Sequence, residues 1–462
     1  MAEAEKELAR YTRKLAKTRL NEEELHTIKR SVIDSYAGIC ASLTDRELLG
    51  EFRRMAMGPG AGSGSAVWGV GQESNIVDAV FLNSILARRS DLLNTYSSPY
   101  GMGGVHPSDN VALAFTLADW LNWSGRQFLE SVNVFFHLAA TFTDHYDPEA
   151  SGFDHDAAAV FWTALTVGQA FNLSEDQLTE AQRIAGGFGF SSNQAAVGDV
   201  TDWKHCTYAS CAMRGLQAAR LARAGFTGPH SIYQGEFGAD HFFRHREMSL
   251  DGEPDLTQII FKRWPALFFC QTPIDVALEL SSRIDAPEDI RAVTVETYGR
   301  AIRNGLTSSA FNPISRAGRT HSLPYCVATA LLKAIEYSDF DSERAHDPQL
   351  RRLLEKIDVT EDPAMTQRFP PATPCRISVT LHTGEVIRHE REFSRGDPHD
   401  PLSDDEVSEK LRRNLDHLAT STDCRAVLPG LWNLEGLDDL AELLAPLTQD
   451  LTSVGSPSGP TA

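Results

Sequence analysis

Several features that would assign a chain to a membrane, a disulfide scaffold or a nucleotide site are missing from this sequence. No stretch approaches the ~18 consecutive apolar residues of a transmembrane helix, and the charged N-terminus has no apolar run typical of a secretory signal. The seven cysteines are scattered without a CxxC pair, which predicts reduced thiols in a cytoplasmic protein. GxGxxG after a strand, GKS or GKT, and GxSxG are all absent, so nucleotide binding and the commonest serine-hydrolase chemistry have no support.

Positive charge is scarce as well. The 462 residues include 43 Lys and Arg against 63 Asp and Glu, a formal net charge of −20. This field repels nucleic acid and anionic membrane surfaces, so neither is expected as a partner. If the substrate is a di- or tricarboxylate, a few converging Lys, Arg and His side chains must supply the attraction that the whole chain lacks.

What the sequence does contain, over roughly its first 265 residues, is one amphipathic segment after another. Residues 21–43, 75–93 and 155–173 space their apolar side chains at three and four, so that one face of each predicted helix can be buried. Glycines and prolines separate the segments, as in the loop at 225–230. This repeated apolar spacing predicts a large helical domain.

After about residue 270 the pattern changes. Alternating apolar and polar residues predict a strand at 290–298 and a hairpin at 375–393, and the segment 321–337 between them predicts a helix. A helix follows the hairpin, with Ser403 as its N-cap and Glu406 completing a capping box.

The sequence therefore predicts a mainly α protein with an α+β second domain. A large all-helical domain is built from both chain ends, 1–270 and 399–450, and a smaller α+β lid domain, 271–398, is inserted in it. The low-complexity tail 451–462 is predicted to be disordered.

The first candidate site joins Asp91 and Thr95 to His106 across a glycine-rich loop between two helices. These side chains can face one cavity, although a helix end with a surface histidine explains the local sequence equally simply. The second is the acidic loop 144–156, in which His155 begins a helix and could act as a neutral base. A divalent metal is chemically possible there, but the spacing fits no standard metal motif and a solvated acidic loop is the simpler interpretation.

Three further segments hold cations or proton donors. Lys204 precedes an alanine-rich helix and could bring an ammonium and a helix N-terminus to one carboxylate. Lys262 and Arg263 are adjacent cations at the predicted domain junction, and His321 and Tyr325 share one short segment whose phenol could transfer a proton. Taken singly, each segment also has an ordinary structural explanation.

Read together and in order, these segments resemble the MmgE/PrpD family, which contains 2-methylcitrate dehydratase, cis-aconitate decarboxylase and iminodisuccinate epimerase. The resemblance runs from about residue 25 to residue 445. The most specific stretches are HSLPY at 321–325 and GDPHDPLSDDEV at 396–407, and HPSDN with ADWL is closest to the dehydratase branch.

The resemblance implies a helical domain with an α+β lid, a homodimer, an active site between the domains, and neither a metal nor an organic cofactor. It implies active-site roles for seven residues of this chain: Asp91, Thr95, His106, His155, Lys204, Lys262 and Tyr325. We predict His155, His106, Tyr325 and Lys204 as catalytic, and Asp91, Thr95, Lys262, Arg263 and His321 as substrate-binding.

Three positions depart from the family pattern. Phe269 stands where the dehydratases usually have a histidine, Thr320 where they have an aspartate, and Asn94 where they have an acidic residue. The substrate pocket is therefore expected to differ from that of 2-methylcitrate dehydratase.

The leading functional hypothesis is a lyase that dehydrates a 2-methylcitrate-like 2-hydroxy acid by proton removal beside a carboxylate. Decarboxylation of a cis-aconitate-like acid and epimerisation beside a carboxylate use the same carbanion chemistry and remain open. From other classes, a non-catalytic relative with a binding role and, more weakly, a metallohydrolase at 144–156 remain open.

Overall fold

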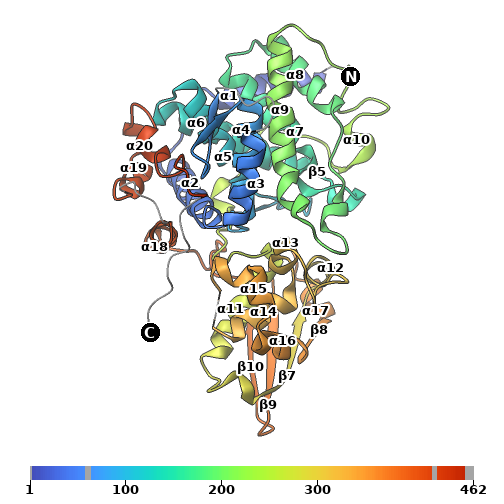
Figure 1. Cartoon of the computed structure of the whole chain (residues 1–462). Coiled ribbons are helices and arrows are strands. Elements are labelled where there is room, and N and C mark those ends of the chain that lie inside the picture. The colour runs from blue at the N-terminus through green and yellow to red at the C-terminus, as the bar shows by residue number, and fades with distance from the viewer. Residues whose placement is uncertain (1–2, 58–63, 334, 419–423, 453–462) are drawn as a thin grey trace.

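The computed structural model describes residues 3–57, 64–333, 335–418 and 424–452, and it shows a larger helical domain joined to a smaller α+β domain (Figure 1). From residue 453 onward the predicted disordered tail lies outside the described residues. No helix within the described ranges is both long and apolar enough to cross a membrane.

The helical domain has one hydrophobic core to which both ends of the chain contribute, from Leu8 to Phe261 and again from Leu402 to Leu451. Its helices are α1 (Glu3–Leu15), α2 (Glu22–Ser42), α3 (Arg46–Ala56), α4 (Ile76–Arg89), α5 (Asp109–Leu121), α6 (Gly125–His145), α7 (Ala159–Ala170), α8 (Glu175–Gly187), α9 (Thr207–Arg223), α10 (Ala239–Phe242), α18 (Asp404–Asp416), α19 (Val427–Trp432) and α20 (Ala441–Leu444). Short two-stranded pairs join some of them: β1 (Ser65–Val67) with β2 (Gln72–Ser74), β3 (Tyr96–Ser97) with β4 (Gly104–Val105), and β5 (Tyr146–Asp147) with β6 (Arg244–His245).

Local sequence explains where the long helices begin. Asn21 and Ser124 start α2 and α6 with capping boxes, and Asn75 accepts hydrogen bonds from the first backbone amides of α4. The predicted capping box of Ser403 and Glu406 is confirmed at the start of α18. α18 then packs on α2, so the end of the chain completes the domain that its beginning started.

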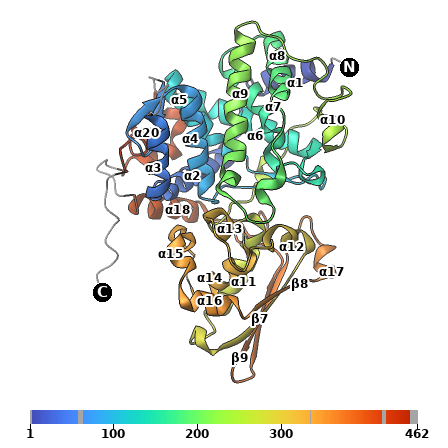
Figure 2. The same ribbon diagram turned by 45° about the vertical axis from the view of Figure 1, so that its right-hand side comes forward.

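The α+β domain has its own core, from Ala266 to Ile387, built on a four-stranded sheet of order β10-β9-β7-β8. The parallel pair is β7 with β8, and the other two pairs are antiparallel. α11 and α14 lie on this sheet, which Figure 2 shows extending away from the helical domain. Its elements are α11 (Gln271–Ser281), β7 (Ile290–Thr297), α12 (Gly299–Gly305), α13 (Arg316–Thr320), α14 (Leu323–Leu331), α15 (Ser342–Ala345), α16 (Pro348–Leu354), β8 (Ile357–Glu361), α17 (Pro363–Thr366), β9 (Cys375–Leu381) and β10 (Val386–Arg391).

The predicted fold class, a large helical domain with a smaller α+β domain, is confirmed. The strand at 290–298 and the hairpin at 375–393 are present as β7 and as β9 with β10. The helix predicted over 321–337 is too long, because α14 ends at Leu331 and Lys333 adopts a left-handed backbone with φ 61°. Tyr337 instead lies in a buried 3-10 turn, so burial of an apolar side chain did not require the helix to continue.

Candidate active site

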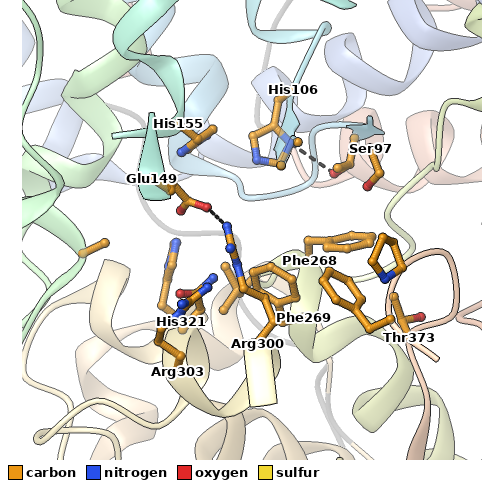
Figure 3. Close-up of a pocket in the computed structure, with 18 of the residues that line it drawn as sticks. Ser97, His106, Glu149, His155, Phe268, Phe269, Arg300, Arg303, His321 and Thr373 are labelled. Carbon is orange, nitrogen blue, oxygen red and sulfur yellow. Dashed lines mark hydrogen bonds and ion pairs between the residues drawn. The ribbon is translucent and has the colours of Figure 1, made fainter. Parts of the chain in front are cut away.

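A cavity of about 290 Å³ lies between the two domains and is lined by both (Figure 3). The helical domain contributes charged and imidazole side chains, and the α+β domain contributes α12, the turn Phe268–Cys270 and the segment after α17. We call these two sides the helical wall and the α+β wall. A concave site with convergent polar groups at a domain junction is the usual place for a small-molecule ligand.

The C-terminal end of α4 places the first two charges of the helical wall. Arg88 is 2% exposed, and its Nε and Nη1 atoms have no hydrogen-bond partner among the described residues. Asp91 follows in a left-handed backbone conformation, with φ 52°. Thr320 donates a hydrogen bond to Asp91 Oδ2 at 2.6 Å, and Lys262 Nζ lies 3.8 Å from Oδ1. Asp91 is thus the anion around which side chains from both domains gather.

The tautomer of His106 follows from its contacts. Its Nδ1 lies 2.7 Å from the backbone carbonyl oxygen of Asn94 and 3.2 Å from Thr95 Oγ1. Since a carbonyl oxygen only accepts hydrogen bonds, Nδ1 carries the proton and Nε2 keeps a lone pair. His106 lines the cavity, so this lone pair can act as a base.

Each ring nitrogen of His155 lies near one carboxylate and one cation, with Asp154 Oδ1 3.3 Å from Nδ1 and Asp156 Oδ2 3.3 Å from Nε2. Lys204 Nζ lies 3.4 Å from its Nδ1, and Arg88 Nη2 lies 3.5 Å from its Nε2. Lys204 is also paired with the fully buried carboxylate of Asp154 at 2.7 Å. The His155 and His106 rings meet edge to face, with centroids 5.4 Å apart.

Lys262 belongs to the same wall, although it lies far along the chain from Asp91 and Thr95. Thr95 and Ile260 exchange two backbone hydrogen bonds, both 2.8 Å long, which hold these two chain segments together. Lys262 Nζ then donates to the backbone oxygen of Asp91 at 3.2 Å. Behind it, the buried ammonium of Lys410 donates to the backbone oxygen of Lys262 at 2.7 Å and is paired with Asp34 at 2.6 Å. α18 therefore helps to hold this cation in place.

His321 enters from the α+β domain, directly after α13. Its Nδ1 lies 2.9 Å from the backbone oxygen of Ala317, so here also Nδ1 carries the proton and Nε2 is left as an acceptor.

Burial and neighbouring cations keep these imidazoles neutral. Burial lowers the pKa of His106 far below its usual value, and Arg88 and Lys262 lower it further. The pKa of His155 is lowered in the same way, by burial and then by Lys204. Burial also lowers the pKa of His321, to about 4, although the Asp91 carboxylate acts to raise it. Neutral imidazoles can accept a proton, and cations beside them can stabilise the negative charge that develops.

The carboxylates of the helical wall differ in charge. Burial would raise the pKa of Asp91, but His321, Lys262 and Arg88 outweigh it and the pKa is lowered. Burial raises the pKa of Asp156 well above its usual value, and Asp109 adds to this rise. The surroundings thus favour the ionised form of Asp91 and the protonated form of Asp156.

The loop that could hold a metal fits a cation poorly. Ligand atoms of Asp154, His155 and Asp156 lie within 4.8 Å of one another. However, the Lys204 ammonium already occupies one Asp154 oxygen, and Arg88 Nη2 lies 3.5 Å from His155 Nε2. Both features oppose a second positive charge there.

The α+β wall combines cations with aromatic rings. Arg300 on α12 forms an ion pair with Glu149 of the helical domain, and Arg303 lies exposed one turn further along α12 (Figure 3). Phe268, Phe269 and Phe369 are half-buried and face the cavity.

Two family models together match nearly the whole chain. Residues 6–251 match the MmgE/PrpD N-terminal domain, and residues 264–434 match the MmgE/PrpD C-terminal domain. This chain belongs to the MmgE/PrpD family. The resemblance noted in the sequence is confirmed.

Named relatives of this MmgE/PrpD protein carry two different activities. A 2-methylcitrate dehydratase of Cupriavidus necator is 26% identical over 396 residues, which cover 76% of this chain and 78% of that protein. A cis-aconitate decarboxylase of Homo sapiens is 25% identical over 387 residues, covering 79% and 78%. A 2-methylcitrate dehydratase of Escherichia coli K12 is 25% identical over 342 residues, covering 68% and 69%.

The MmgE/PrpD structure brings most of the predicted site residues together and leaves two apart. Those that line the cavity are Asp91, Thr95, His106, His155, Lys204, Lys262 and His321. Arg263 is exposed and stacks over the Trp264 ring outside the cavity lining. Tyr325 donates its phenol proton to the backbone oxygen of Asp339 and does not line the cavity, so it receives no part in the chemistry proposed below.

Sequence reasoning missed Arg88, Arg300 and Arg303. Arg88 had a readable signal, because it falls on the buried face of an otherwise apolar helix, where an arginine needs a special reason. The arginines of α12 had none, since solvent-exposed arginines are common in any helix.

Of the three departures from the MmgE/PrpD pattern, one reaches the cavity. Phe269 lines it. Asn94 is fully buried and bonds Ser31 and the backbone amide of Ser108. Thr320 is fully buried against Asp91, where a second carboxylate would face a like charge. The expected change in the pocket thus concentrates at Phe269.

Proposed function

We propose that this protein is a lyase that removes water from a 2-hydroxy di- or tricarboxylate related to 2-methylcitrate. The observation that carries the proposal is the helical wall, where the neutral His106 lies beside the buried cations Arg88 and Lys262. A base and fixed positive charge in one buried site are what proton removal beside a carboxylate requires.

Two cations are suited to hold the substrate carboxylates. Arg88 lines the cavity as a buried guanidinium, and a carboxylate can accept hydrogen bonds from such a group. Lys262, whose ammonium lies 3.8 Å from Asp91 Oδ1, adds a second cation. Lys204 is already paired with Asp154, so it contributes positive field more than a free binding group.

The proton transfers balance with one base. His106 Nε2 accepts the proton from the carbon beside a carboxylate, and the electron pair of that C–H bond forms the C=C bond. The C–O bond to the hydroxyl breaks, and the imidazolium returns its proton to the leaving hydroxide, which departs as water. Arg88 and Lys262 stabilise the enediolate charge between these steps. Without them, the weakly acidic carbon would not release its proton to an imidazole.

The other two imidazoles have supporting roles. Each ring nitrogen of His155 lies within 3.5 Å of one cation and one carboxylate, which suits this residue to orienting Arg88 and Lys204. His321 offers its Nε2 lone pair from the opposite domain and can accept a hydrogen bond from the substrate hydroxyl.

Decarboxylation of a cis-aconitate-like acid is the second candidate, because the human decarboxylase is as similar to this chain as the dehydratases are. In that reaction the histidine must first take up a proton from solvent at Nε2, and the carbanion left by the loss of CO₂ then takes this proton from the imidazolium. The homodimer and the absence of a cofactor stay predictions from the family resemblance.

An NMR assay in deuterated buffer with EDTA tests the proposal. The purified protein is incubated separately with 2-methylcitrate, citrate, cis-aconitate, citramalate and iminodisuccinate. A new olefinic signal with loss of water supports dehydration, release of CO₂ supports the second candidate, and inversion at one carbon supports epimerisation. Silence from folded protein across the panel would contradict the proposed reaction and favour a binding role.

A further inference from the structure

The α+β wall contains an apolar surface that the proposed chemistry leaves unused. Phe268 and Phe269 lie in the turn Phe268–Cys270 before α11, and Phe369 follows α17. We call these three side chains the aromatic wall. Figure 3 shows Phe268 and Phe269 on the side of the pocket opposite His106 and His155.

The rings of the aromatic wall are held in place by contacts with one another and with the domain core. The Phe268 and Phe269 centroids lie 5.3 Å apart, and those of Phe269 and Phe369 lie 6.2 Å apart. Behind them, the buried Tyr298 stacks on Phe369 with centroids 4.6 Å apart and planes at 16°. Aromatic contacts of this kind fix ring orientation, so the surface exists before any ligand arrives.

The three rings are only half-buried, although Phe269 and Phe369 pack against the core of their domain. The uncovered aromatic surface faces the same cavity as His106, Arg88 and Lys262. A fully polar acid such as citrate would leave this surface in contact with water or carboxylate oxygens. An apolar group placed there would gain about 0.8 kcal/mol for each buried methylene, which is about fourfold in affinity.

Polarity therefore changes across one cavity, from buried charges on the helical wall to aromatic rings on the α+β wall. We propose that the substrate is a di- or tricarboxylate carrying an alkyl or aryl substituent larger than a methyl group, which the aromatic wall binds while the helical wall holds the carboxylates. Phe268, Phe269 and Phe369 are then specificity-determining residues. The inference rests on the proposed carboxylate chemistry of this pocket and names the substrate class more narrowly.

Binding of saturated acids tests the inference without requiring turnover. Isothermal calorimetry on the full chain would compare propane-1,2,3-tricarboxylate with derivatives carrying methyl, butyl or hexyl on a terminal methylene. These acids have no hydroxyl and cannot be dehydrated. We expect the dissociation constant to fall by at least tenfold from the unsubstituted acid to the butyl derivative. A flat series, or no binding by any member, would overturn the inference.

Substitutions in the aromatic wall test whether the alkyl group binds there. Phe269→His replaces an apolar ring of the aromatic wall with a polar one, and we expect it to reduce the ratio of the dissociation constants of the unsubstituted and butyl acids by about tenfold. Phe268→Ala provides a second probe that does not depend on the folding of the first. Phe237→His is the matched control, because Phe237 is 72% exposed and lies outside the cavity lining. A ratio unchanged in both aromatic-wall variants would also overturn the inference.

The outcomes separate this inference from the proposed function. Turnover of 2-methylcitrate with a flat binding series would leave the lyase standing and remove the apolar subsite. A steep binding series without turnover of any hydroxylated acid would leave the subsite standing and remove the lyase.

Discussion

The two walls of the central cavity are built differently. The helical wall places its charges on rigid, buried backbone: Arg88, Lys204 and Lys262 are each less than 5% exposed. Apart from the buried His321, the α+β wall consists of half-buried rings and of arginines that are partly or fully exposed. Buried charges in a low-dielectric site act strongly on one another, whereas exposed ones are screened. The difference assigns chemistry to the helical wall and substrate selection to the α+β wall.

Replacing the base should have the largest effect. His106→Gln keeps the size of the side chain but removes the Nε2 lone pair, and we expect kcat to fall by about 10²- to 10⁴-fold. Steady-state kinetics on the acid identified by NMR would measure it. His382→Gln, in the exposed turn between β9 and β10, serves as the control. Wild-type kcat in His106→Gln would remove this residue from the chemistry and the division between the walls with it.

The buried pair of Lys204 and Asp154 should matter most for folding. Lys204→Met leaves the fully buried Asp154 carboxylate without its partner, and we expect a loss of about 3–5 kcal/mol in the free energy of unfolding. Urea denaturation would measure it. The double variant Lys204→Met with Asp154→Asn should recover most of the loss, because no buried charge is then unpaired. A single variant as stable as wild type would show that the helical wall tolerates an isolated charge.

The pH dependence of kcat/KM should show whether the charge of Lys262 is needed for activity. Burial lowers the pKa of Lys262 to about 8. The side chain is charged below this pH and neutral above it, so kcat/KM should fall about tenfold for each pH unit above about 8. Lys262→Arg keeps its charge at these pH values and should lose this alkaline decline. Circular dichroism at each pH would show that the protein stays folded, and an unchanged decline in Lys262→Arg would assign it to another group.

The smallest effect is expected from the ion pair that links the walls. Arg300 and Glu149 are both partly exposed, and such pairs contribute about 0.2–1 kcal/mol. Glu149→Gln should therefore change KM by less than about fivefold and leave the melting temperature nearly unchanged. A loss as large as that of His106→Gln would mean that the α+β wall takes part in the chemistry.

Most secondary structure of the helical domain could be predicted because the signals are local. Apolar spacing and capping residues sit within a few positions of each other, as at Asn75 before α4. The helix after His321 was predicted too long, because no local sequence signal indicates that the backbone of Lys333 adopts a left-handed conformation. Seven predicted site residues line the cavity because the family resemblance identified segments that are far apart in the chain.

Contacts between residues far apart in the chain could not be predicted from local sequence patterns. The sequence could not show that Tyr325 turns its hydroxyl toward Asp339, or that Arg263 points away from the cavity that Lys262 lines. Nor could it show that Thr320 donates to Asp91, 229 positions earlier. A side chain's direction depends on the packing of its whole element, and neighbouring residues in sequence can face opposite sides.

The sequence by itself determined the fold class, the acidic charge and the family, because these depend on composition, periodicity and ordered segments. The tertiary structure decided which groups share a low-dielectric site, and therefore which imidazoles are neutral and which carboxylates are charged. Those properties arise from burial and from charges a few ångströms away, to which residues from both domains contribute.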